Sequence, residues 1–118
     1  MRAVVIGAVG STRVLVEELA EAPEWELSLV GTLPPELHGR HSDLVDMAPL
    51  AEKAGAALFP ITRTNDAEVL DRVRAERPDY VFVVGWSQIV GPEFLSIAAK
   101  GAIGYHPAPL PRLRGRAA

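Results

Sequence analysis

Short apolar runs alternate with amphipathic stretches along the chain. The runs AVVIG and YVFVV begin at residues 3 and 80 and are continuous and apolar, and WELSLVGT, which begins at residue 25, is read as a further strand. Continuous runs of this kind are typical of parallel strands that are buried on both faces. With two weaker runs, they predict strands over residues 3–7, 25–32, 57–61, 80–84 and 102–105. Pro60 places the third strand at an edge of the sheet, because proline cannot donate to a central ladder.

Segments with helical spacing separate these strands. Ser11 can cap a first helix, which Pro23 stops. A short helix within residues 42–55 has Pro49 in its first turn and Gly55 as its stop. The apolar face of the first helix is expected to hold Val14, Leu15, Leu19 and Ala22.

Two more helices follow in the second half of the chain. Asn65 with Glu68 forms a capping-box pattern for a helix that ends before Pro78. Gly91 and Pro92 open the last helix, which Gly101 closes. Their apolar faces are expected to hold Val69, Leu70 and Val73, and Phe94, Leu95, Ile97 and Ala98.

This alternation predicts an α/β fold with a mostly parallel, Rossmann-like open sheet and helices on both faces. The length of 118 residues allows one domain. Ligands of such sheets lie beyond the carboxyl ends of the strands. Three segments are therefore expected at one edge of the sheet, namely GAVGST, GWSQIVGP and HPAPLPRLRG.

The net charge of −3 argues against a general attraction to nucleic acid or anionic lipid. Cysteine is absent, which removes disulfides and thiolate chemistry, fits a reducing compartment and leads us to expect the cytoplasm. The apolar run at the N-terminus is too short for a signal peptide, and no stretch approaches the ~18 apolar residues of a membrane span.

Few residues suggest chemistry by themselves. The first loop does not fit GxGxxG, so it is equally well a phosphate or carboxylate site or a plain strand-to-helix turn. His38 and His41 match no closed metal-ligand spacing and are expected to be solvated. Trp86 could line a cleft, although packing is the commoner use of such a residue. His106, held by Pro107, could stabilise charge or transfer a proton, or could be structural.

The stretch GAIGYHPAPLPRLRG at residues 101–115 resembles the signature of the folate-dependent formyltransferases. That family includes glycinamide ribonucleotide, methionyl-tRNA and sugar N-formyltransferases, and its signature is Asn-x-His-Pro followed by a Leu-Pro-x-x-Arg-Gly loop. His106-Pro107, Leu110-Pro111 and Arg114-Gly115 match it in order and spacing. The resemblance covers essentially the whole chain and looks closest to the sugar N-formyltransferases. It implies that residues 1–118 are the N-terminal, folate-binding part of a formyltransferase domain.

The resemblance also implies a reaction, in which an acceptor amine takes the formyl group of 10-formyltetrahydrofolate. The expected acceptor is an amino sugar, free or nucleotide-linked. His106 matches the family histidine that serves the transfer step. The formyl donor would be held beside Trp86, Ser87, Gln88, Ile89 and Val90, mostly by backbone groups, and the acceptor near Gly10, Ser11, Thr12 and Arg114. No metal, nucleic acid or membrane partner is expected.

Two departures from the family pattern keep an alternative open. Gly104 stands where the family has an asparagine, and losing one oxyanion donor costs about 10² to 10³ in rate. The family aspartate that partners the histidine would fall beyond Ala118. A non-catalytic protein that binds folate or a partner chain is therefore the second reading. A nucleotide-binding domain unrelated to folate would explain the fold but not HPAPLP. An exposed fifth strand also predicts self-association or completion by another chain.

Overall fold

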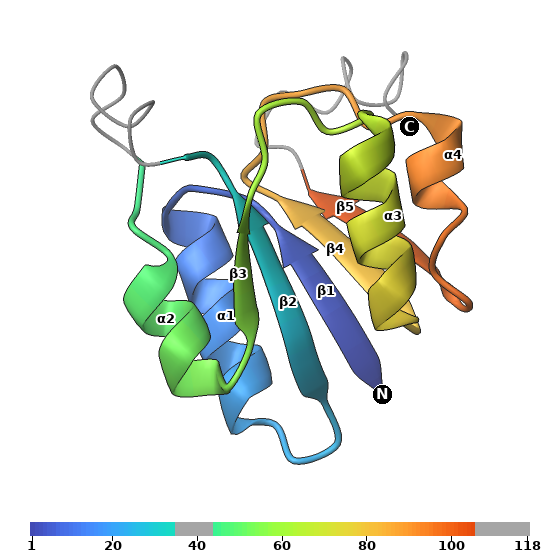
Figure 1. The fold of residues 1–118 in the computed structure, drawn as a ribbon. Helices are drawn as coiled ribbons and strands as arrows, with labels where there is room; N and C mark the ends of the chain where they lie inside the picture. Colours follow the sequence, from blue (N-terminus) through green and yellow to red (C-terminus); the bar gives the residue numbers. More distant parts are fainter. Residues whose placement is uncertain (35–43, 106–118) are drawn as a thin grey trace.

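The computed structural model describes residues 1–34 and 44–105, which contain one five-stranded sheet (Figure 1). Its strand order is β3-β2-β1-β4-β5, and all neighbouring strands pair in parallel. The predicted parallel α/β fold is therefore confirmed, with β3 at one edge. The strands are β1 (Arg2–Ile6), β2 (Glu26–Thr32), β3 (Ala57–Pro60), β4 (Tyr80–Val84) and β5 (Gly101–Tyr105).

Helices cover both faces of the sheet, as Figure 1 shows. On one face lie α1 (Gly10–Glu21) and α2 (Ala48–Ala54), and on the other lie α3 (Ala67–Glu76) and α4 (Pro92–Leu95). The predicted end of α2 is confirmed, since Gly55 follows it with a left-handed φ of 76°. Arg77 follows α3 in the same region of φ, at 51°, just before Pro78.

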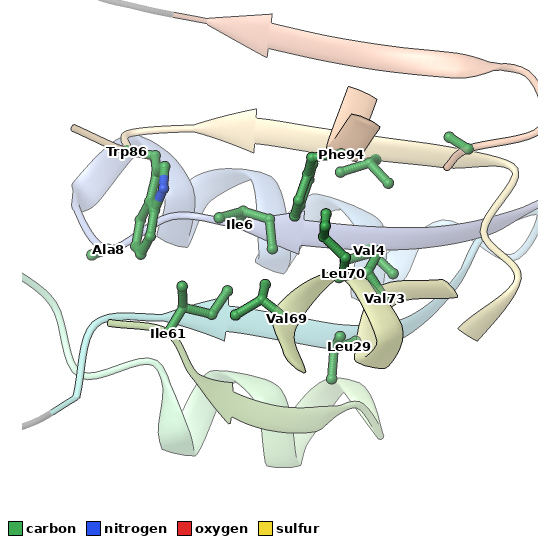
Figure 2. Packing of buried hydrophobic residues seen from close by; sticks show 12 residues of the cluster. Val4, Ile6, Ala8, Leu29, Ile61, Val69, Leu70, Val73, Trp86 and Phe94 are labelled. Atoms are coloured by element: carbon green, nitrogen blue, oxygen red, sulfur yellow. The ribbon is translucent and has the colours of Figure 1, made fainter. Parts of the chain in front are cut away.

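Alternate residues of β1 feed two separate cores. Val4 and Ile6 belong to the core under α3 and α4, which Figure 2 shows, whereas Ala3 and Val5 belong to the core under α1 and α2. All four side chains are fully buried. Burial on both faces explains why the central strands read as unbroken apolar runs.

The direction in which successive strands are added to the sheet reverses between β1 and β4. The chain leaves β1 towards β2 and β3 on one side, whereas β4 leads to β5 on the other. The loops after β1 and β4 therefore lead to helices on opposite faces of the sheet, and open α/β sheets form their crevices at the carboxyl edge between such loops. This edge, residues 7–12 and 85–91 with the end of β5, is called the rim below.

The helices differ from the sequence prediction in detail. The cap of α1 is Val9 rather than Ser11, and its buried face holds Thr12, Val16 and Leu19. Val14 is 52% exposed, so the predicted apolar face was wrong by part of a turn. Ala22 lies just beyond the helix, in an extended conformation.

The caps and the length of later helices were also mispredicted. Helix α3 is preceded by Asp66, so Asn65 does not cap it. Helix α4 has only four residues and ends at Leu95 instead of continuing towards Gly101. The predicted burial of Phe94 and Ala98 is nevertheless confirmed, because the turns that follow α4 keep both against the sheet.

Candidate functional site

Two glycine-containing loops cross at the centre of the rim. A Cβ atom at Gly7 would lie 2.0 Å from the Val84 carbonyl oxygen, and one at Gly85 would lie 2.3 Å from a methyl of Val9. Gly85 also has a φ of 68°, which side-chain-bearing residues rarely adopt. The Ala8 amide donates to the Gly85 carbonyl at 3.1 Å, which joins the two loops directly. Only glycine allows this close approach.

Thr12 holds the start of α1 against the end of β4. Its hydroxyl donates to the Val84 carbonyl at 2.6 Å and accepts from the Val9 amide at 3.3 Å. The side chain is fully buried, so Thr12 lies beneath the rim and not on its surface. Of the predicted acceptor-binding residues in this loop, Ser11 is exposed and Gly10 is half-buried. We therefore assign Thr12 a structural contact in place of the predicted substrate contact.

A polar brace fixes the loop after β4. Six hydrogen bonds join residues 62–65 to residues 86–91. The Trp86 indole Nε1 donates to Thr64 Oγ1 at 2.7 Å, and Thr64 Oγ1 donates to Gln88 Oε1 at 2.6 Å. Gln88 Nε2 donates to the Thr62 carbonyl at 2.6 Å, and Asn65 holds the far end of the loop. Thr62, Thr64 and Asn65 are called the polar brace below.

The loop of residues 86–91, which the polar brace holds, contains both buried and exposed side chains. Trp86 is 7% exposed and packs at the end of the core, near Ala8 and Ile61 in Figure 2. Ser87 is exposed, and Ile89 is 85% exposed, which is unusual for a large apolar side chain. Gln88 and Val90 are half-buried.

The backbone of the same loop presents unpaired donors. The amides of Ser87, Gln88, Ile89 and Val90 donate to no acceptor within residues 1–34 and 44–105. A rigid turn with unpaired amides and an exposed apolar side chain suits a flat heterocycle that carries hydrogen-bond acceptors.

Strand β5 brings Gly104 to the rim, opposite Val83 in the register of β4. A Cβ atom there would meet only the Val83 carbonyl oxygen, at 3.8 Å. Glycine is thus not required by packing at this position. A Cβ atom at this position would make only an ordinary van der Waals contact within the described residues.

The other predicted candidates lie outside the described residues. These are His106, Arg114, His38 and His41. The chain re-enters the described part at Leu44, which forms a bridge with Val9, while the Val45 amide donates to the Ala8 carbonyl at 2.8 Å. Leu44 and Val45 therefore lie beside the loop after β1. The described residues hold no cluster of three or more histidine, cysteine or acidic side chains suited to a metal, and no helix long and apolar enough to cross a membrane.

A cavity of about 450 Å³ lies far from the rim, at the amino ends of β1 and β2. Arg2, Glu26 and Glu76 line it, and Arg2 pairs with both carboxylates at 2.8 and 3.1 Å. Burial alone would raise the pKa of Glu76. Hydrogen bonds from Arg72 and Ser28 and the charges of Arg72 and Arg2 outweigh it, so the pKa lies below its usual value. Because its cations and anions neutralise one another, we assign this cavity a structural role.

Sequence reasoning missed the polar brace. Thr64 is 1% exposed, yet it stands in a polar segment that gives no sign of burial. The signal at Asn65 was real but misassigned, because a side chain that can cap a helix can equally bond a neighbouring loop.

The described residues form a doubly wound α/β domain whose candidate site lies where the loops after β1 and β4 meet. Residues 1–118 match the family model described as formyl transferase. The chain belongs to the formyl transferase family, which confirms the resemblance seen in the sequence.

Known proteins resemble the chain in sequence and in fold. It is 35% identical over 104 residues to the methionyl-tRNA formyltransferase of Magnetococcus marinus, covering 86% of this chain and 33% of that protein. It is 39% identical over 99 residues to that of Treponema pallidum, covering 74% and 31%. The structure of phosphoribosylglycinamide formyltransferase from Anaplasma phagocytophilum matches with a TM-score of 0.66 at 19% identity, over 94% of this chain and 52% of that one. The chain thus spans about a third of the length of the curated relatives it matches.

Proposed function

We propose that this chain supplies the formyl-donor site of an enzyme that transfers the formyl group of 10-formyltetrahydrofolate to an amine. The braced loop of residues 86–91 carries the proposal. Its unpaired amides and the exposed Ile89 match the backbone recognition of a pterin expected from the family. Ser87, Gln88 and Val90 complete this donor site, and Trp86 supports it from below.

The proposed chemistry is a direct acyl transfer. The acceptor nitrogen forms a bond to the formyl carbon, and the bond from that carbon to N10 of the folate then breaks. The acceptor nitrogen loses one proton and N10 gains one, so no oxidant or metal is required. His106 is proposed to stabilise the intermediate oxyanion and to assist this proton transfer.

The acceptor is proposed to bind near Gly10, Ser11 and Arg114. An amino sugar is the acceptor that the sequence resemblance favours. The curated relatives are named methionyl-tRNA formyltransferases, so the amino group of methionyl-tRNA is the second candidate, in place of the predicted lack of a nucleic-acid partner. The alternative of a non-catalytic folate binder rests on Gly104. A cytoplasmic location remains part of the proposal.

Titration with 5-formyltetrahydrofolate, a stable isomer of the formyl donor, tests the donor site. In a Trp25→Phe variant, Trp86 is the one remaining tryptophan, and its fluorescence should change on binding. No binding by calorimetry would reject the donor site in this chain.

A transfer assay with amino sugars, amino acids and methionyl-tRNA then identifies the acceptor. His106→Ala should lower the transfer rate by at least about 10²-fold while leaving binding of the folate intact. Binding without transfer to any acceptor would favour the non-catalytic reading.

A further inference from the structure

We propose that Thr64 and Asn65 are positioning residues for the formyl donor, acting through the backbone of residues 86–91. The inference rests on the proposed function, since it assigns how the donor site of that reaction is held in shape. Neither residue lies in the family signature or in the loop itself. Both reach the loop from the segment between β3 and α3.

The Thr64 hydroxyl links Trp86 to Gln88 through two hydrogen bonds. Its hydroxyl accepts a hydrogen from Trp86 and donates its own to Gln88 Oε1, while its backbone amide donates to the same oxygen at 2.8 Å. Since Gln88 Nε2 donates to Thr62, the orientation of the Gln88 amide group is fixed as well. Serine could replace threonine here, but valine would leave the buried indole N–H without its acceptor.

Asn65 holds the loop on both sides of Val90. Its Nδ2 donates to the Ile89 carbonyl at 2.9 Å, and its Oδ1 accepts from the Gly91 amide at 2.8 Å. A Cβ atom at Gly91 would lie 3.0 Å from this same Oδ1, so the contact is close. The Ile89 carbonyl and the Gly91 amide are thereby engaged, which fixes the backbone on both sides of Val90 while the amides of residues 87–90 have no acceptor among the described residues.

A loop fixed in advance binds more tightly than one that must be ordered by its ligand. Asn65 is exposed, and within the described residues its side chain forms hydrogen bonds to this loop alone. Its loss should therefore affect ligand affinity more than the stability of the fold. A merely structural residue would show the opposite balance.

The test measures the Kd of 5-formyltetrahydrofolate by calorimetry for the 118-residue chain and four variants. Asn65→Ala should raise Kd about tenfold with little change in the unfolding midpoint, and amide exchange at Gly91 should accelerate. Thr64→Val should raise Kd by a similar factor, and Thr64→Ser should restore it. Thr32→Val is the matched control, because the buried Thr32 hydroxyl has no hydrogen-bond partner among the described residues.

Unchanged Kd in folded Asn65→Ala and Thr64→Val would overturn the positioning role while leaving the donor site standing. Should Thr64→Val fail to fold, Asn65→Ala alone decides. A wild-type chain that binds no folate would instead reject the proposed function, and the two failures are therefore distinguishable.

Discussion

Some polar side chains in this chain form hydrogen bonds with residues that are distant in the sequence, instead of the local contacts that the sequence predicts. Asn65 is of a residue type that commonly caps helices, but its side chain forms hydrogen bonds to the loop of residues 86–91. Thr12, predicted to contact substrate, is buried under the crossing of two loops. In both cases the side chain kept the hydrogen-bonding capacity expected of it, while the fold selected the partner.

Glu76 gives a prediction for the dependence of stability on pH. Its pKa is lowered in the folded chain, so its carboxylate stabilises the fold above the ordinary value of 4.5, and this contribution is lost as pH falls through the lower folded pKa. In urea unfolding, the wild type should exceed Glu76→Gln in free energy of unfolding at neutral pH, and the gap should narrow below pH 4.5. Glu18 is exposed and forms no ion pair in the described part of the chain. Glu18→Gln should therefore have the same free energy of unfolding as the wild type at both pH values.

Gly104 offers a test of catalysis by adding a group. Space for a side chain is present, so Gly104→Asn should leave stability nearly unchanged. If the proposed oxyanion lies there, the added amide should raise the rate of formyl transfer by up to about 10² to 10³. Gly104→Ala fills the same space without a donor and is the control. Equal rates for the two variants would place the oxyanion elsewhere.

At the level of elements, the apolar runs predicted the strands to within about a residue, and the sheet order placed their ends at one edge as expected. Strands were predictable because burial on both faces leaves an unbroken apolar signal. The face of α1 and the end of α4 were not, since the tether of Thr12 to β4 and the turns after Leu95 depend on tertiary packing. The role of residues 86–90 in holding the formyl donor stays a prediction from the resemblance, and the polar brace that contacts them was not predicted.

The crossing of the two loops gives a prediction for Gly85. Gly85→Ala would place a methyl group 2.3 Å from Val9 in addition to straining the backbone at positive φ. We expect the free energy of unfolding, measured with urea, to fall by roughly 3 kcal/mol or more. Gly55 also has positive φ but faces open space, so Gly55→Ala should lose only about 1 kcal/mol. Similar losses in both variants would show that the loop crossing tolerates an added methyl group.

For the whole molecule, the described sheet ends in two unlike edges. β3 is short and carries Pro60, whereas β5 pairs, among the described strands, only with β4, and its Ile103 is 44% exposed. Edges of the second kind recruit further strands. Self-association through β5 therefore remains a prediction from the sequence that the shape of the sheet supports.

Sedimentation at increasing concentration should reveal this association in the wild-type chain. Ile103→Lys should suppress it, because a charge on an edge strand opposes pairing between chains. Leu58→Lys on β3, where the side chain is exposed to a similar 41%, should have little effect. A wild-type chain that stays monomeric throughout would count against the β5 edge as a contact.

The tether between Thr12 and Val84 also bears on the order of folding. It joins residues 72 positions apart, and the loop after β1 takes its shape only against Gly85. Long-range contacts of this kind form slowly, because a large loop must close before they are made. During synthesis, α1 can form as soon as it emerges, but its amino end acquires its final geometry only after β4 has been made. The contacts between the loop after β1 and β4 therefore form only after Val84 and Gly85 have been synthesised, and ligand binding at the rim would report that β4 has joined β1.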